Sequence, residues 1–202
     1  MTSAIAIDNN ARAPGIVTAR GRAIWRKIVR ATERALAIIG LFLIVFHVAF
    51  NLDMMTSGSM SPTLQGNGRT GSDWVLSERF THWFRSPRRW ELVAFRNHEG
   101  LQIMKRVISL PGETIVLRKD GTFLVNGSAI ERPTPLTKIE YFPWGTLSSG
   151  NPVPCGKGYF VLGDDSKDSD DSRWNLPVEP DAINGRPWLI VWPLSRFGFV
   201  NP

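Results

Sequence analysis

Cysteine and histidine are scarce in this sequence of 202 residues. Cys155 is the single cysteine, and the histidines are only His47, His82 and His98. One cysteine excludes an internal disulfide framework, and so few metal-binding side chains leave little for a zinc site. Hydrophobic residues make up 43% of the chain and charged residues 21%, which excludes a disordered or low-complexity protein. We therefore expect a globular protein without a disulfide framework and without a cysteine- or histidine-rich metal site.

Positive charge is in excess by six, but it is unevenly distributed. Residues 1–34 hold seven basic and two acidic side chains, a net charge of +5, which leaves +1 for the other 168 residues. A nucleic-acid-binding domain would carry its basic residues on its folded surface. We predict a basic tail over residues 1–34 and no nucleic acid as a partner.

One long apolar run follows the basic tail. Residues 35–50 read ALAIIGLFLIVFHVAF, in which His47 is the only strongly polar residue. Extended to residue 52, the run would measure roughly 27 Å as a helix, close to the ~30 Å hydrocarbon core of a bilayer. We predict a transmembrane helix over residues 35–52, with a cleaved signal peptide and a buried soluble helix as the alternatives.

The basic residues all precede this run, and their position predicts its orientation. Cytoplasmic flanks of membrane helices carry an excess of Lys and Arg. We therefore expect a single-pass protein of the cytoplasmic (inner) membrane with its N-terminus in the cytoplasm. Residues 53–202 would then form an extracytoplasmic domain on the outer side of the membrane.

From residue 73 onward the chain shows no helical pattern of convincing length. Seven short apolar segments are candidate strands: DWVLSERF, ELVAF, LQIMKRVISL, ETIVLRK, TFLVNG, GYFVLGD and PWLIVW. Asp120–Gly121 predicts a two-residue hairpin loop and Asn126–Gly127 a second turn, whereas five prolines predict an irregular excursion over 131–158. The pattern indicates a mainly β domain, a barrel or a folded sheet, over residues 53–202.

Three polar motifs within this domain combine residues that suit a serine–lysine hydrolase. They read SGSMSPTL (57–64), KRVISLPGE (105–113) and GDDSKDSDDSR (163–173). In a strand, Lys105 would point to the same face as Ile103 and Val107. Burial on such an apolar face lowers the pKa of a lysine, so that its neutral amine can take a proton from a serine hydroxyl.

In their order and in their spacing from the apolar run, these motifs resemble those of bacterial type I signal peptidase, the serine–lysine membrane protease of the S26 family. The resemblance covers roughly residues 35–195 and implies a signal-peptidase-like folded β-sheet or barrel as the catalytic domain. It implies that Ser59 is the nucleophile and Lys105 the general base. It also implies an oxyanion hole made of the Ser59 backbone N–H and the Ser57 hydroxyl.

The same resemblance assigns supporting roles in the third motif. Ser169 would hydrogen-bond the lysine amine and orient it, and Asp171 with Arg173 would support the site structurally. The sequence departs from the family pattern at Asp165 and Ser166, where the family often has Asn followed by Arg. The implied function is the removal of N-terminal signal peptides from translocated secretory preproteins, with the peptide bound as an extended strand and with no cofactor.

Membrane lipid is a second expected partner, and we expect a monomer. Residues 81–90 place two Trp and one Phe among three Arg, which predicts a surface that contacts lipid headgroups. The alternative is a loop whose aromatic side chains pack into the β domain.

Other functions remain open at the level of the sequence. A specialised pilus- or conjugation-system peptidase of the same family would keep all of these residues, and a catalytically dead, membrane-tethered β module would bind extended peptides. The five aspartates between residues 164 and 171 do not match the spacing of a calcium loop. A Ser–His–Asp triad would need His82 or His98, and neither lies in a motif that would hold a base.

Overall fold

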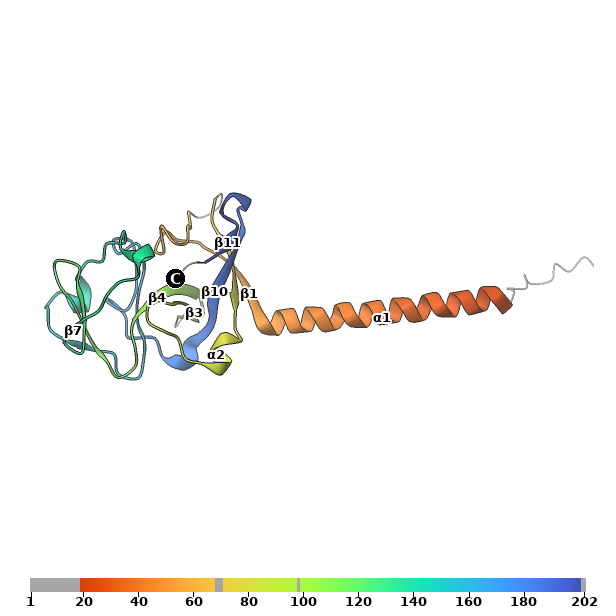
Figure 1. Cartoon of the computed structure of the whole chain (residues 1–202), viewed down its shortest axis with the longest axis horizontal. Helices are drawn as coiled ribbons and strands as arrows, with labels where there is room; N and C mark the ends of the chain where they lie inside the picture. The colour runs from red at the N-terminus through yellow and green to blue at the C-terminus, as the bar shows by residue number, and fades with distance from the viewer. Residues whose placement is uncertain (1–18, 68–70, 98, 201–202) are drawn as a thin grey trace, which may run out of the picture. The chain divides into compact units, whose positions relative to one another are not determined.

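The computed structural model of the chain describes residues 19–67, 71–97 and 99–200. It contains two compact units, residues 1–46 and residues 47–202. The first unit contains most of the helix α1, and the second contains the β domain (Figure 1). Residues 1–18 of the predicted basic tail lie outside the described residues, and residues 19–34 form the first half of α1.

Helix α1 spans Ala19–Ala49 and includes most of the predicted apolar helix. The predicted end at residue 52 is wrong, because the chain enters strand β1 (Phe50–Met54) directly after Ala49. Asn51 and Asp53 interrupt the apolar run there, and pairing with the next strand satisfies the backbone groups. No helix among the described residues has both the length and the apolar character needed to cross a membrane.

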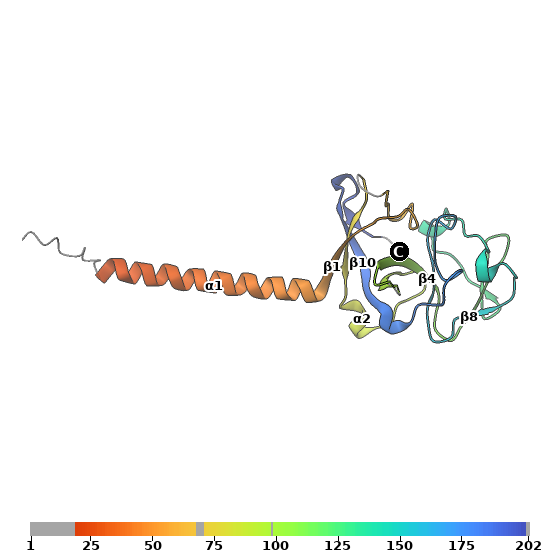
Figure 2. The ribbon, with the colours of Figure 1, turned by 180° about the vertical axis from the view of Figure 1, so that it is seen from behind.

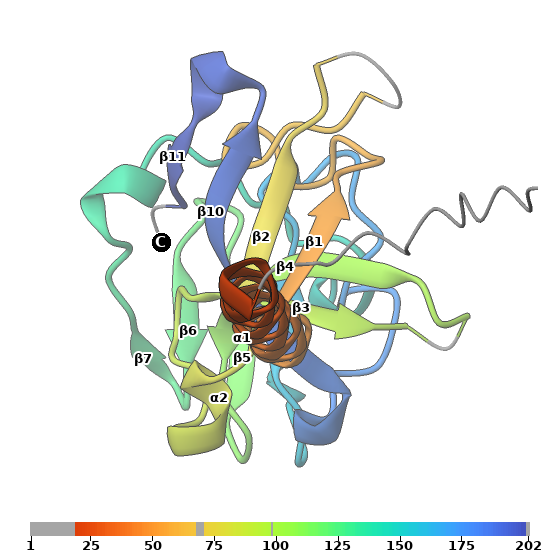
Figure 3. The same cartoon turned by 90° about the vertical axis from the view of Figure 1, so that its right-hand side faces the viewer.

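Two antiparallel sheets form the second unit. The larger sheet contains seven strands: β1, β2 (Trp74–Glu78), β3 (Leu92–Arg96), β4 (Gln102–Ser109), β9 (Phe160–Leu162), β10 (Ile183–Trp192) and β11 (Gly198–Phe199). Its order is β1-β2-β10-β3-β4-β9, with β11 paired to β10. Figure 3 shows β1, β2 and β10 side by side, so that β1 is an edge strand of this sheet.

The smaller sheet contains β5 (Thr114–Leu117), β6 (Phe123–Val125), β7 (Ser128–Ala129) and β8 (Val153–Pro154), in the order β7-β6-β5-β8. Figures 1 and 2 show β7 and β8 at the end of the β unit that lies away from β1. The remaining regular elements are a four-residue helix, α2 (Thr81–Phe84), and four short 3₁₀ turns: η1 (Thr134–Leu136), η2 (Gly145–Leu147), η3 (Pro180–Ala182) and η4 (Leu194–Arg196).

The mainly β architecture predicted for this region is confirmed, and each of the seven predicted segments contains a strand. The Asn126–Gly127 turn is confirmed as well, because both residues have positive φ and join β6 to β7. The Asp120–Gly121 hairpin exists, but its loop is longer than two residues. Arg118 N–H bonds to the Thr122 carbonyl, which leaves residues 119–121 as the loop. The excursion over 131–158 is irregular, and several of its side chains pack into the core.

Three hydrophobic clusters fill the β unit, and β4 contributes to all of them. Met104 belongs to one cluster, Val107 to a second and Ile108 to a third. Because side chains alternate along a strand, Lys105 shares the face of Ile103 and Val107, and Arg106 lies on the opposite face. Lys105 and Arg106 are neighbours in the sequence, and strand β4 places their side chains in two different parts of the core.

Candidate active site

Ser59 lies in the loop that follows β1, and its surroundings hold it in place. Its side chain is buried, and the next residue, Met60, is wholly enclosed in the core. The Ser59 carbonyl accepts the N–H of Asp165 at 3.0 Å, which ties this loop to the third motif. Gly163 makes the approach possible, since a Cβ at that position would lie 2.4 Å from the Ser59 carbonyl oxygen.

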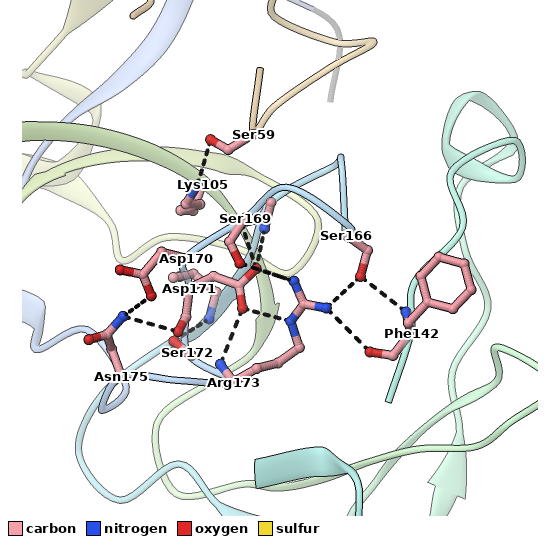
Figure 4. A network of polar contacts seen from close by, with 12 residues as sticks. Ser59, Lys105, Phe142, Ser166, Ser169, Asp170, Asp171, Ser172, Arg173 and Asn175 are labelled. Atoms are coloured by element: carbon pink, nitrogen blue, oxygen red, sulfur yellow. Dashed lines mark hydrogen bonds and ion pairs between the residues drawn. The ribbon is translucent and has the colours of Figure 1, made fainter. Parts of the chain in front are cut away.

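Lys105 reaches Ser59 from strand β4. Its Nζ lies 2.7 Å from Ser59 Oγ, and both side chains are buried. Figure 4 shows the lysine directly beneath the serine hydroxyl. The two residues are 46 positions apart in the sequence. At this distance a neutral amine can accept the proton of the hydroxyl, which is the arrangement that nucleophilic catalysis requires.

Burial changes the proton affinity of this lysine. Desolvation lowers the pKa of Lys105 from 10.5 to about 8, and the charge of Arg173 acts in the same direction. The carboxylates of Asp171, Asp170 and Asp164 oppose this shift. A substantial fraction of the amine is therefore neutral near pH 8, as predicted from the apolar strand face.

Ser57 lies close to the same serine hydroxyl. Its Oγ donates to Ser59 Oγ at 3.3 Å. The loop brings the two serines together in a tight turn that is closed by the Ser61 N–H and the Gly58 carbonyl at 2.8 Å. A hydroxyl at this position can turn from Ser59 Oγ toward an oxyanion that forms beside it.

Ser169 has a different partner from the one expected. Its hydroxyl donates to Asp171 Oδ2 at 2.7 Å, and among the described residues no hydrogen bond joins it to Lys105. Asp171 is itself held by Arg173, whose Nε and a terminal nitrogen donate to the two carboxylate oxygens at 2.8 Å each. Figure 4 shows this group below the lysine, with Ser169 nearest to it. The Ser169 hydroxyl donates its proton to Asp171. A lone pair of Ser169 Oγ therefore remains available to accept a hydrogen bond from the direction of Lys105.

The departure from the family pattern at Ser166 has a structural counterpart. Ser166 is buried, and its Oγ accepts Arg173 at 2.6 Å and the Phe142 N–H at 3.0 Å. A small hydroxyl thus links the ion pair of Asp171 and Arg173 to the irregular segment over 131–158. Asp165, the other departure, donates its N–H to the Ser59 carbonyl and needs no particular side chain for that contact.

A second buried ion pair supports the site from the other face of β4. Arg106 binds Asp164 through two hydrogen bonds of 2.8 and 2.7 Å, and neither side chain is exposed. Asp164 also accepts the hydroxyls of Tyr141 and Thr63, and Arg106 donates to the Trp90 carbonyl. Sequence reasoning assigned no role to this pair. The sequence did contain an indication of this pair. Arg106 follows Lys105 within an apolar strand, and a buried cation there needs an anionic partner.

Removing the carboxylate of this second pair is expected to destabilise the protein strongly. Asp164→Ala leaves the Arg106 charge buried without a partner, and breaking such pairs costs about 3–5 kcal/mol. Urea unfolding of residues 47–202 measures the loss. The matched control is Arg85→Ala, which removes the partly exposed pair with Glu91 and is expected to cost about 1 kcal/mol or less. Equal losses in the two variants would contradict this role of the Arg106–Asp164 pair.

The alternative sites find no support in the geometry. The described part of the chain contains no group of three or more His, Cys, Asp or Glu side chains placed to hold a metal ion. His82 lies in α2, where burial lowers its pKa, and its ring nitrogens have no hydrogen-bond partner among the described residues. His98 lies outside the described residues. The pairing of Ser59 with Lys105 therefore remains the arrangement with the clearest catalytic chemistry.

Comparison with known proteins adds an independent line of argument. A family model described as "Signal peptidase, peptidase S26" matches residues 26–192. The signal peptidase I of Leptolyngbya laminosa is 33% identical over 155 residues, which cover 72% of this chain and 70% of that protein. Signal peptidase I V of Bacillus subtilis strain 168 is 34% identical over 137 residues, 63% of this chain and 77% of that protein.

A solved structure is also similar to part of the chain. It is the crystal structure of a signal peptidase I from Enterococcus faecalis V583, with 31% identity and a TM-score of 0.41. The similarity covers 50% of this chain and 97% of that one. The residues matched by the family model contain all three polar motifs and the whole of strand β4.

Proposed function

The chain belongs to the S26 family of signal peptidases, and on that premise we propose that Ser59 and Lys105 carry out its peptide-bond hydrolysis. It is a peptidase that removes signal peptides, as its relatives named signal peptidase I do. The observation that supports the proposed residues is the 2.7 Å distance between Lys105 Nζ and Ser59 Oγ in a buried setting. A catalytically dead peptide-binding module would have no need for this contact or for a lysine with a lowered pKa.

The proposed mechanism begins with proton transfer. Neutral Lys105 takes the proton of Ser59, whose oxygen attacks the carbonyl carbon of the scissile bond. The Ser59 N–H and the Ser57 hydroxyl then stabilise the negative charge on the carbonyl oxygen. The lysine returns its proton to the leaving amine, which gives an acyl-enzyme at Ser59. A water molecule, deprotonated by the same lysine, hydrolyses that ester and restores both groups.

The support for the base comes from the groups around it. The Ser169 oxygen, whose proton is held by Asp171, can accept an N–H of Lys105 and so direct its lone pair toward Ser59. Arg173 holds the carboxylate of Asp171 in place, so that the support does not depend on a mobile side chain. We propose a monomer as the active form, because a single copy of the chain brings Lys105 Nζ within 2.7 Å of Ser59 Oγ.

The direct test of this function is cleavage of a preprotein. The full chain in detergent should cut a secretory preprotein after a signal peptide that ends in an Ala-x-Ala sequence, and Ser59→Ala should leave the preprotein intact. N-terminal sequencing of the product gives the position of the cut. Cleavage that persists unchanged in Ser59→Ala would contradict the assignment of the nucleophile.

The family is membrane-associated, and we propose that the apolar half of α1 attaches this chain to the cytoplasmic membrane. Large apolar side chains between residues 36 and 48 are exposed in the helix, including Phe42 and Ile44. The basic residues that precede them favour a cytoplasmic N-terminus and a catalytic unit on the outer side. Alkaline extraction of membranes and a reporter fused to the C-terminus test the attachment and the orientation.

The segment over 81–90 supports a second contact with the membrane. Trp83 and Phe84 of α2 are 59% and 86% exposed, whereas Trp90 is buried in the core. The alternative of aromatic packing into the β domain therefore holds for Trp90 and not for the other two. Exposed aromatic rings beside Arg85 suit the headgroup layer of an anionic bilayer.

Removing the two exposed rings is expected to weaken lipid binding. The compact unit of residues 47–202 should co-sediment with anionic liposomes at low salt, and Trp83→Ala with Phe84→Ala should reduce the bound fraction while leaving cleavage of a soluble peptide nearly unchanged. Trp144→Ala, which removes an exposed Trp outside this segment, is the matched control. Absence of binding by the unmutated unit would contradict the lipid contact.

A further inference from the structure

Asp53 presents a buried carboxylate oxygen that has no hydrogen-bond partner. Its Oδ2 is enclosed, and among the described residues no hydrogen bond or ion pair satisfies it. Arg79 and Arg96 are close enough to act on its charge without forming an ion pair with it in the described part of the chain. An unsatisfied buried acceptor costs about 1–3 kcal/mol. A carboxylate that remains unsatisfied at this cost in folding free energy is a candidate for contact with a ligand.

Asp53 lies on the face of β1 that packs against the loop carrying Ser59. Side chains alternate along a strand, so Asp53 and Met55 point the same way. Met55 packs in one core cluster with Met60, which directly follows Ser59 in the sequence. The side chain of Asp53 is therefore one strand repeat, roughly 6.6 Å, back along β1 from the side chain that packs beside this loop.

Strand β1 can also accept an additional strand. It lies at the end of the strand order, with β2 as its partner. The Met55 N–H and the Ala49 carbonyl bond toward the β2 side. By the alternation of antiparallel pairing, the backbone groups of Leu52 and Met54 face the open edge. An extended peptide can pair with those groups and run along β1 toward Ser59.

The register of such a peptide follows from the spacing of the strand. In such a complex, the residue whose carbonyl Ser59 attacks would lie against Met55, whose side chain packs with Met60. In an extended peptide the side chain two positions earlier points to the same side and lies roughly 6.6 Å farther along. That distance matches the step from Met55 back to Asp53. Substrate residues are numbered here backward from the scissile bond, and the first is the one whose carbonyl is attacked. In this numbering the Asp53 carboxyl faces the third residue.

We propose that Asp53 is a specificity-determining residue that favours substrates with a hydroxyl side chain, Thr or Ser, at this third residue. The inference rests on the proposed function and names a preference of that same site. A hydroxyl donates one hydrogen bond to the unsatisfied oxygen, while an apolar side chain of equal size leaves it unsatisfied. A lysine fits less well, since Arg79 and Arg96 repel its charge.

Burial raises the pKa of Asp53, which is consistent with the poorly solvated position of its carboxyl group. The charges of Arg96 and Arg79 oppose that shift. Both protonation states of the carboxyl retain an oxygen that can accept the hydroxyl proton. The preference for a hydroxyl is therefore expected on either side of that pKa.

Two peptides that differ only at this position test the proposal. One carries Thr and the other Val, which match in shape and differ in the hydroxyl. The full chain should cut the Thr peptide with a kcat/KM about tenfold higher, in line with one hydrogen bond to a charged group. Asp53→Val should bring the ratio to about 1 or below, and Asp53→Asn should keep part of it. Leu194→Ala, at an exposed residue outside β1, is the control that leaves the ratio unchanged.

The outcomes separate the inference from the function it rests on. Equal cleavage of both peptides by the unmutated chain, or an unchanged ratio in Asp53→Val, would overturn the role of Asp53 alone. Cleavage of neither peptide would overturn the proposed function and the inference with it. If Asp53→Val fails to fold, the ratio of the unmutated chain and that of Asp53→Asn still decide the matter.

Discussion

Lys105→Arg is expected to abolish cleavage, with a loss comparable to that of Ser59→Ala. The base must lose its proton before it can accept one from Ser59, and a guanidinium stays protonated at any pH that the protein tolerates. Its planar head is also larger than the amine group that lies 2.7 Å from Ser59 Oγ. Single-turnover cleavage of a preprotein measures the effect. Lys167→Arg, at an exposed lysine, is the matched control and should cleave normally.

The pH dependence of the unmutated chain tests the same base in another way. The pKa of Lys105 is lowered to about 8 by burial. Below that pH the neutral fraction of the amine rises tenfold for each unit, so kcat/KM should rise with pH and level off above about 8. A rate that stays flat between pH 6 and about 8 would contradict lysine as the general base, whatever the effect of the arginine variant.

Ser57→Ala is expected to lower kcat by roughly 10²–10³ with little change in KM. Its hydroxyl lies 3.3 Å from Ser59 Oγ, where it can turn to the oxyanion only after the attack has begun. An interaction made in the transition state alone appears in kcat rather than in KM. Steady-state kinetics on a peptide substrate measure both constants.

Two controls sharpen this result. Ser59→Ala removes the nucleophile and should abolish turnover, whereas Ser61→Ala changes a third serine of the same loop and should have little effect. Equal and mild losses for Ser57→Ala and Ser59→Ala would indicate that the loop is a polar linker with no catalytic role.

The strands of this protein could be predicted because their signals are local. Seven apolar segments separated by Gly, Pro and Asn each contain a strand, and Asn126–Gly127 forms the expected turn. The end of α1 could not be predicted in the same way. Phe50 and Leu52 are apolar enough to continue a helix in spite of Asn51, and their pairing with the next strand, β2, makes this segment a strand.

The chemistry of the proposed catalytic residues was also visible in the sequence. A serine in a loop after the apolar run and a lysine within an apolar strand predict a nucleophile and a desolvated base. The distance between Ser59 and Lys105 comes from the fold, because residues 46 positions apart meet only when β4 is packed against the loop after β1. Likewise, the burial that lowers the lysine pKa exists only in the folded β unit, where Lys105 is almost fully enclosed.

By itself, the sequence determined which groups could react, where the basic charge lies and which segments favour strands. The tertiary structure decided which partner each buried polar group has. Five aspartates lie between residues 164 and 171, and any of them could accept a hydrogen bond. Asp164 binds Arg106 and Asp171 binds both Ser169 and Arg173. The physical reason is that a hydrogen bond depends on the position and direction of both groups in space, which spacing along the chain does not specify.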